Sequence, residues 1–147
     1  KMGLTALDQS EGKVEPDKQD SKVEKDTTSA NEILQKRTNK WRSQSLKLTL
    51  PPNQGLEVKA LIDQGERLLF QWAASSGTVS FDMHGNAVDA AEDDFTSFWL
   101  GKGESQAAGT FEAPFSGLHG WYWENESDQA ITITLELEGY YKGIVQY

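Results

Sequence analysis

The sequence has no cysteine among its 147 residues. The chain therefore forms no disulfide, and it has neither a catalytic thiol nor thiolate ligands for a zinc ion. It also lacks an apolar run near the ~18 residues that span a bilayer, and no apolar leader follows a charged start. As it stands, the chain is expected to be soluble, and its cysteine content fits the periplasm and the cytoplasm alike.

Large rings are missing from the first forty residues, because every Phe, Tyr and Trp lies at or after Trp41. Charge is divided just as unevenly. Residues 1–42 hold nine Lys and Arg against eight Asp and Glu, a net charge of +1, and residues 43–147 hold five against fifteen, a net charge of −10. A domain this acidic repels nucleic acids and anionic lipids, since both are bound mainly by Lys and Arg. We therefore expect no nucleic-acid partner.

The N-terminal region is predicted to be a linker. It mixes charges of both signs with few apolar residues, a composition that buries too little surface to fold. A capping-box pattern at Ser29 and Glu32 predicts one short helix, over residues 30–38. The expected organisation is a polar, mostly disordered linker over residues 1–43, followed by one folded domain over residues 44–147.

Apolar and polar residues alternate through the second region, most clearly in the run Ile131–Leu137. Turn-forming residues at 53–55, 63–65 and 75–77 separate such runs, which recur at spacings of about 8–14 residues. No convincing helical stretch lies between them. The pattern predicts an all-β fold, an antiparallel β-sandwich or jelly roll of about eight strands.

Motifs of common enzymes are absent from the sequence. It contains no G-x-S-x-G elbow, no H-E-x-x-H helix and no P-loop. Its paired carboxylates, such as Asp93 with Asp94 and Glu136 with Glu138, fall on an expected loop and an expected solvent face. We therefore expect that the protein is not an enzyme.

The stretch GTFEAPFSGLHGWYWEN, from Gly109 to Asn125, resembles the signature of the GOLD domain, the β-sandwich of Golgi cargo receptors. In that signature F-x-A-P is followed by a glycine, an aromatic residue, alternating apolar residues, an acidic residue and an asparagine. The residues that fill the matching positions are Phe111, Gly117, Trp121, Trp123 and Asn125. The resemblance implies a GOLD-like β-sandwich in which these residues are structural.

A bacterial group of membrane-anchored GOLD-like proteins is more similar still, through FDMHG at 81–85 and HGWYWEN at 119–125. Lys1–Thr5 also resembles the stretch that follows the single N-terminal transmembrane helix in that group. This resemblance implies a domain on the periplasmic face of the bacterial inner membrane, anchored by a helix absent from this sequence. Its partner is then expected to be a protein in the periplasm or inner membrane.

The aromatic residues suggest where a partner binds. If Trp121 and Trp123 point inward, Tyr122 points outward and is free to stack on a partner. Phe98 and Trp99 are adjacent in an expected strand, so one of them should lie near a surface. The sequence thus predicts a non-catalytic protein-interaction domain that binds through Tyr122, Trp99 and Phe98. A second alternative is a carbohydrate-binding module using Tyr122 and Trp99.

The two histidines offer another alternative, a periplasmic copper- or zinc-binding protein. His84 and His119, with Asp82 and Met83, provide the imidazole, carboxylate and thioether ligands that suit Cu or Zn. His84 approaches His119 if it lies past a strand end, beside Gly85. Otherwise each imidazole packs beside a glycine turn and donates to a backbone carbonyl, and the protein then needs no cofactor.

Overall fold

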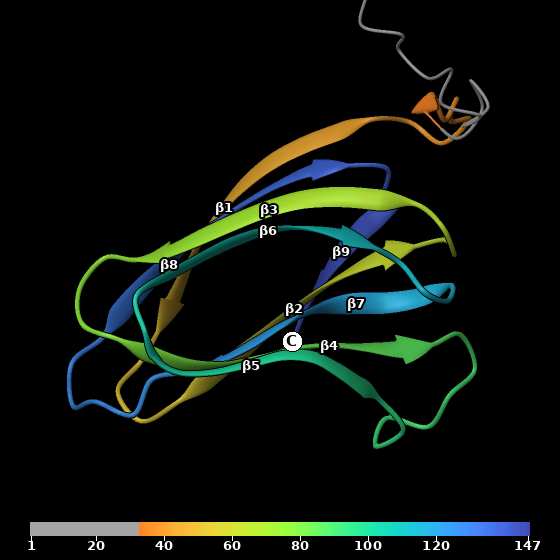
Figure 1. The fold of residues 1–147 in the computed structure, drawn as a ribbon. Coiled ribbons are helices and arrows are strands. Elements are labelled where there is room, and N and C mark those ends of the chain that lie inside the picture. Colours follow the sequence, from red (N-terminus) through yellow and green to blue (C-terminus); the bar gives the residue numbers. More distant parts are fainter. Residues whose placement is uncertain (1–32) are drawn as a thin grey trace, which may run out of the picture. The chain divides into compact units, whose positions relative to one another are not determined.

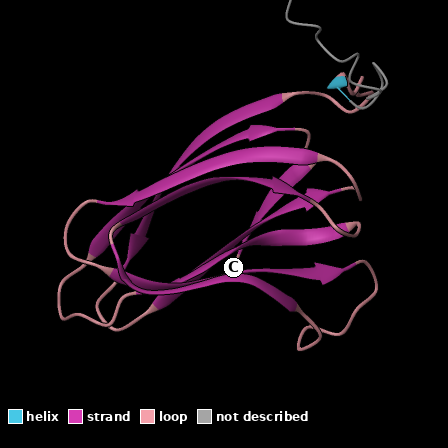
Figure 2. Ribbon diagram, viewed as in Figure 1, coloured by secondary structure: helices cyan, strands magenta, loops and turns pink. Residues whose placement is uncertain are grey.

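Nine β-strands account for most of residues 33–147, the part of the chain that the computed structural model describes. Figures 1 and 2 show them as arrows joined by turns. They belong to a unit that spans residues 36–147. Their bounds are β1 (Arg42–Leu50), β2 (Gly55–Ile62), β3 (Arg67–Ala74), β4 (Val79–Ala87), β5 (Thr96–Glu104), β6 (Gln106–Glu112), β7 (Gly117–Glu124), β8 (Ile131–Gly139) and β9 (Gly143–Gln146).

The strands form two antiparallel sheets that face each other (Figure 1). One sheet has the order β1-β8-β3-β6, and the other has the order β5-β4-β7-β2-β9. Without β9, this is the strand order of a jelly roll, in which two four-stranded sheets enclose the core. The predicted all-β antiparallel sandwich is therefore confirmed.

The ninth strand goes beyond the roughly eight that alternation predicts. β9 has only four residues, too few for a period of two to be recognised. It pairs with β2, where Ala60 lies opposite Ile144. Its place beside β2 is decided by tertiary contact, because no local pattern marks it as a strand.

The segment before β1 is held by side-chain bonds to the turn between β2 and β3. The Arg37 guanidinium donates to the carbonyl oxygen of Gly65 at 2.8 Å and to the Glu66 carboxylate at 3.2 Å. The Asn39 amide donates to the Asp63 carboxylate at 3.2 Å. Residues 34–38 are not helical, so the predicted helix over 30–38 is not found there. Ile33 is helical, and the remainder of that prediction, with the linker up to residue 32, lies outside the described residues.

Aromatic rings fill the space between the sheets. The Trp72 ring meets Phe81 and Trp123 at centroid distances of 5.2 and 6.0 Å, and Trp121 stacks on Trp123 at 6.1 Å. All four rings are buried. The three indole N–H groups have no hydrogen-bond partner among the described residues, at a cost of about 1–3 kcal/mol each, so packing must outweigh that cost.

The residues that carry the GOLD resemblance occupy positions where packing is tight. Trp121, Trp123 and Asn125 are fully buried, and Phe111 is half-buried. A Cβ at Gly117 would lie 2.0 Å from the carbonyl oxygen of Asn86, so no side chain fits there.

Asn125 joins the end of β7 to the end of β1. Its buried side-chain amide donates to the carbonyl oxygens of Leu50, Pro51 and Gln129 at 3.2, 3.3 and 2.6 Å. Its side-chain oxygen accepts from the Ser127 backbone N–H at 3.0 Å, as in an Asx turn. One side chain thus forms a local turn and also links two sheets.

Replacing Asn125 by alanine should destabilise the domain strongly. The substitution removes the buried amide that bonds to Leu50, Pro51 and Gln129 and the side-chain oxygen that accepts from Ser127, which predicts a loss of about 3 kcal/mol in the free energy of unfolding. Urea denaturation measures the change. Ser80→Ala is a matched control, since the Ser80 hydroxyl bonds only to an exposed Glu126 carboxylate, and a change under about 0.5 kcal/mol is expected there. Equal stability of the two variants would contradict the role of Asn125.

Candidate functional site

Strand β7 divides its side chains between two environments. Trp121 and Trp123 point into the core and are 0% exposed, so Tyr122 between them points outward. The strand register places Glu57 of β2 on one side of Tyr122 and Asp82 of β4 on the other. This outward row therefore combines an aromatic ring with two carboxylates.

The outer face of the five-stranded sheet is hollowed over β2, β4 and β7. The hollow, which we call the outer groove, has a volume of about 830 Å³, within the range of known ligand sites. Its lining residues are Glu57, Lys59, Leu61, Asp82, His84, Asn86, Ala87, Val88, Asp89, Ala90, Glu92, Phe95, Gly117, Leu118, Tyr122 and Tyr147.

A glycine allows long side chains to cross β7 beneath the groove. Gly120 lies opposite Lys59 of β2 and opposite His84 of β4, so no side chain stands between them. A Cβ at Gly120 would lie 1.9 Å from the carbonyl oxygen of Val58 and is not tolerated. The Lys59 ammonium therefore spans β7 and donates to the Asn86 side-chain oxygen of β4 at 2.6 Å.

Lys59 is the buried cation of the groove. Besides its bond to Asn86, its ammonium pairs with the Glu57 carboxylate at 2.8 Å and lies 5.7 Å from the centre of the Tyr147 ring. The residue is only 7% exposed. A lysine this buried requires such partners, since an unpaired ammonium out of water is costly.

His84 continues this polar network toward the edge of the sheet. Its Nδ1 donates to the carbonyl oxygen of Asp82 at 3.2 Å, and its Nε2 lies 3.6 Å from the Glu57 carboxylate. The Phe95 ring covers the imidazole at a centroid distance of 5.0 Å. Asp82 in turn accepts from the Ser97 hydroxyl at 2.9 Å. The polar groups of the floor are thus bonded to one another.

The groove carries an excess of negative charge. Its lining includes four carboxylates, those of Glu57, Asp82, Asp89 and Glu92, and one ammonium, that of Lys59. Burial raises the pKa of Tyr122, and the charges of Glu124 and Glu57 raise it further, so its hydroxyl stays protonated at neutral pH. The groove therefore offers aromatic surface, hydrogen-bonding groups and a negative potential.

His119 lies on the other side of the same sheet. It is 1% exposed, and the rings of Phe98, Phe111 and Phe115 surround it at centroid distances of 5.7, 5.2 and 4.7 Å. Its Nε2 donates to the carbonyl oxygen of Phe115 at 2.8 Å. A Cβ at Gly85 would lie 2.1 Å from its Nδ1, so this imidazole packs against a glycine, as the alternative to metal binding predicts.

The residues proposed for Cu or Zn are not brought together. His84 and Asp82 face the outer groove, whereas His119 and Met83 face the core, with the backbone of the sheet between the two pairs. The two carboxylates near His84 approach opposite ring nitrogens, Nδ1 and Nε2, and cannot share an ion with one of them. Residues 33–147 contain no group of three or more His, Cys, Asp or Glu placed to hold a metal.

Phe98 and Trp99 break the rule that adjacent strand residues face opposite ways. The pairing of β4 with β5 shifts between Met83 and His84, whose partners are Trp99 and Ser97, so Phe98 is an additional residue in β5. Such a bulge lets both rings turn toward the inside of the sandwich. Phe98 packs in the rings around His119, and Trp99 remains 42% exposed. Neither residue joins Tyr122 in the outer groove.

Sequence reasoning missed Glu57, Lys59 and Asn86 as functional residues. A signal for the first two exists, because they alternate with Val58 and Ala60 and must face outward together. Their convergence on Asn86 depends on the neighbouring strands and has no local signal.

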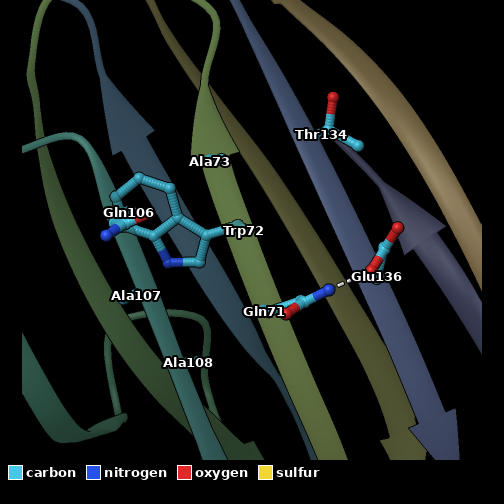
Figure 3. A pocket seen from close by; sticks show the side chains of 8 residues that line it. All are labelled: Gln71, Trp72, Ala73, Gln106, Ala107, Ala108, Thr134 and Glu136. Atoms are coloured by element: carbon cyan, nitrogen blue, oxygen red, sulfur yellow. Dashed lines mark hydrogen bonds between the residues drawn. The ribbon is translucent and has the colours of Figure 1, made fainter.

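A second, smaller hollow lies on the outer face of the four-stranded sheet (Figure 3). It measures about 480 Å³, and the Gln71 amide donates to the Glu136 carboxylate across it. Trp72 leaves β3 on the opposite face, toward the core. Gln71, Gln106 and Glu136 are exposed, so water competes for their hydrogen bonds. The outer groove, with its buried polar floor, is the better candidate site.

Comparisons with known proteins show no family for this chain. No protein-family profile matches the chain, and no curated protein matches it. A mitogen from Yersinia pseudotuberculosis is similar in structure, with 10% identity and a TM-score of 0.47 over 65% of this chain and 84% of that one. A de novo designed double-stranded β-helix has 22% identity and a TM-score of 0.36, over 64% of this chain and 97% of the designed one. The class defined by the strand order is an antiparallel jelly-roll domain.

His119 should make stability depend on pH. Burial lowers its pKa from 6.5, its bond to Phe115 opposes this, and the charge of Lys59 lowers it further. The unfolded chain therefore binds the proton more readily, and the stability contributed by neutral His119 is complete above pH 6.5 and is lost as the pH falls below it.

We expect the free energy of unfolding to fall between about pH 7 and about pH 5, and to fall less in His119→Gln, whose amide can still donate to Phe115. Urea denaturation across this range measures both slopes. Ser80→Ala, which changes no titratable group, is the control and should keep the wild-type slope. An unchanged slope in His119→Gln would show that another group is responsible.

Proposed function

We propose that this chain is a non-catalytic protein-interaction domain that binds a segment of a partner in the outer groove. The observation that carries the proposal is the groove itself, about 830 Å³ in volume, with a floor of mutually bonded polar side chains. Around this floor stand the rings of Phe95, Tyr122 and Tyr147. Aromatic side chains beside desolvated polar groups are typical of the centres of protein interfaces.

Charge supports the choice of partner. The groove lining carries four carboxylates against one ammonium, and residues 43–147 carry a net charge of −10. A partner segment with Lys or Arg gains from this potential, and an acidic one is repelled. The proposed partner therefore presents a basic segment to the groove.

The resemblance to membrane-anchored GOLD-like proteins adds a cellular location to this proposal. On that basis the domain acts at the periplasmic face of a bacterial inner membrane, and the partner is a periplasmic or inner-membrane protein. Among residues 33–147, no helix has the length and apolar content needed to cross a bilayer.

Site-specific photocrosslinking tests the proposal. A photoreactive amino acid at Leu118, which lines the groove, should capture one defined protein in cells of the source organism. The same amino acid at Thr134, on the outer face of the other sheet, is the control and should not capture it. Tyr122→Ala should lower the yield at Leu118, and affinity for the isolated partner should fall about tenfold. Equal capture at both positions would refute the proposal.

A carbohydrate ligand is a second candidate, because the Tyr122 ring lies in register between two carboxylates, Glu57 and Asp82. An aromatic ring can stack on the apolar face of a sugar, and the neighbouring carboxylates can accept hydrogen bonds from the sugar hydroxyls. NMR titration with a glycan panel tests it, through shifts of the signals of Tyr122 and its neighbours. Trp99 should not respond, since it lies outside the groove lining. Unchanged spectra across the panel would count against this candidate.

A further inference from the structure

Four strands of the sandwich have an edge that pairs with no other described strand: β1 and β6 in one sheet, β5 and β9 in the other. An open edge exposes backbone N–H and C=O groups, and proteins usually obstruct such edges because another chain can add to them. β1 carries Lys47 at its middle and is followed by Pro51 and Pro52. β5 is distorted by two register shifts, and β9 has only four residues.

β6 has none of these obstructions. Its seven residues, Gln106–Glu112, include no Lys, Arg or Pro. They pair with β3 in one unbroken register, from Glu112 opposite Arg67 to Gln106 opposite Ala73. The second to fourth residues are Ala107, Ala108 and Gly109, so small side chains leave this part of the edge open to another strand.

A partly exposed aromatic ring, that of Trp99, lies near this edge. Ala107, Gly109 and Phe111 are the β6 residues that face the core, and Gly109 contributes no side chain. A Cβ at Gly109 would approach the Phe70 ring at 3.1 Å, and Phe70 packs against Trp99 at a centroid distance of 6.5 Å. Phe70 is 6% exposed, but Trp99 is 42% exposed. The bulge that turns Trp99 inward thus leaves its indole uncovered near the edge of β6.

We propose that β6 is a second binding site, at which an extended peptide segment adds to the sheet β1-β8-β3-β6 as a fifth strand. The backbone of the segment pairs with the free edge of β6, and one large apolar side chain, placed opposite Gly109, covers Trp99. The net charge of −10 over residues 43–147 favours a segment without acidic residues. β6 belongs to the sheet opposite the outer groove, so the proposal is independent of the proposed function.

Selection from a displayed library of random peptides about nine residues long, the length of a typical strand, tests this site on the full chain. We expect enriched peptides that alternate in polarity and carry one central Phe, Leu, Ile or Trp. When an enriched peptide is titrated into the isotope-labelled protein, the NMR signals of the β6 amides and of the Trp99 indole should shift. The signals of Tyr122 and His84 in the outer groove should not.

Two variants and a control locate the site. Gly109→Val places a branched side chain against the Phe70 ring, which already lies 3.1 Å from the position of a Cβ, and Ala108→Lys places a positive charge on the exposed face of the edge, so each should weaken binding about tenfold or more. Val145→Lys adds the same charge to the edge strand β9 and should leave affinity unchanged.

Two results would overturn the β6 site. One is a selection that enriches no sequence. The other is an enriched set that shifts the outer groove and leaves β6 unaffected. The second result would support the proposed function while removing this one, so failures of the two proposals are distinguishable.

Discussion

The packing of indole rings between the two sheets is the constraint on which the rest of the structure depends. Trp121 and Trp123 stack on each other, and Trp72 meets Trp123 from the opposite sheet. Because a strand alternates its side chains, burial of the two β7 rings determines that Tyr122 and Gly120 face outward. The core and the outer groove therefore lie on opposite faces of β7. A register slip of one residue in β7 would exchange these faces and disrupt the core and the groove together.

The floor of the groove shows how a sheet can hold charges without a deep cavity. Gly120 leaves room for Lys59 to reach Asn86 across β7, and the Glu57 carboxylate lies between the ammonium and His84. Each of these groups is partly withdrawn from water, so each depends on its neighbours for hydrogen bonds. Such a network is rigid and preorganised, which lowers the entropic cost of binding a ligand over it.

Local sequence patterns predict the fold well where a strand is long and half-buried, as in Ile131–Leu137, whose alternation is found in β8. They fail where a strand is short, as in β9, or irregular, as at Phe98, where one inserted residue turns two adjacent rings the same way. The candidate site is predicted only in part. Tyr122 follows from its tryptophan neighbours, but the pairing of His84 with His119 fails because they face opposite sides of one sheet.

The sequence by itself determined the class of fold, the shared strand face of Trp121 and Trp123 and the acidic character of the domain, because alternation and composition are local properties that neighbouring strands do not alter. Only the tertiary structure decided which side chains meet. Glu57, Lys59, His84 and Asn86 come from two strands that are separated in the sheet by a third. Their distances depend on strand order and register, and these are set by the packing of the whole core.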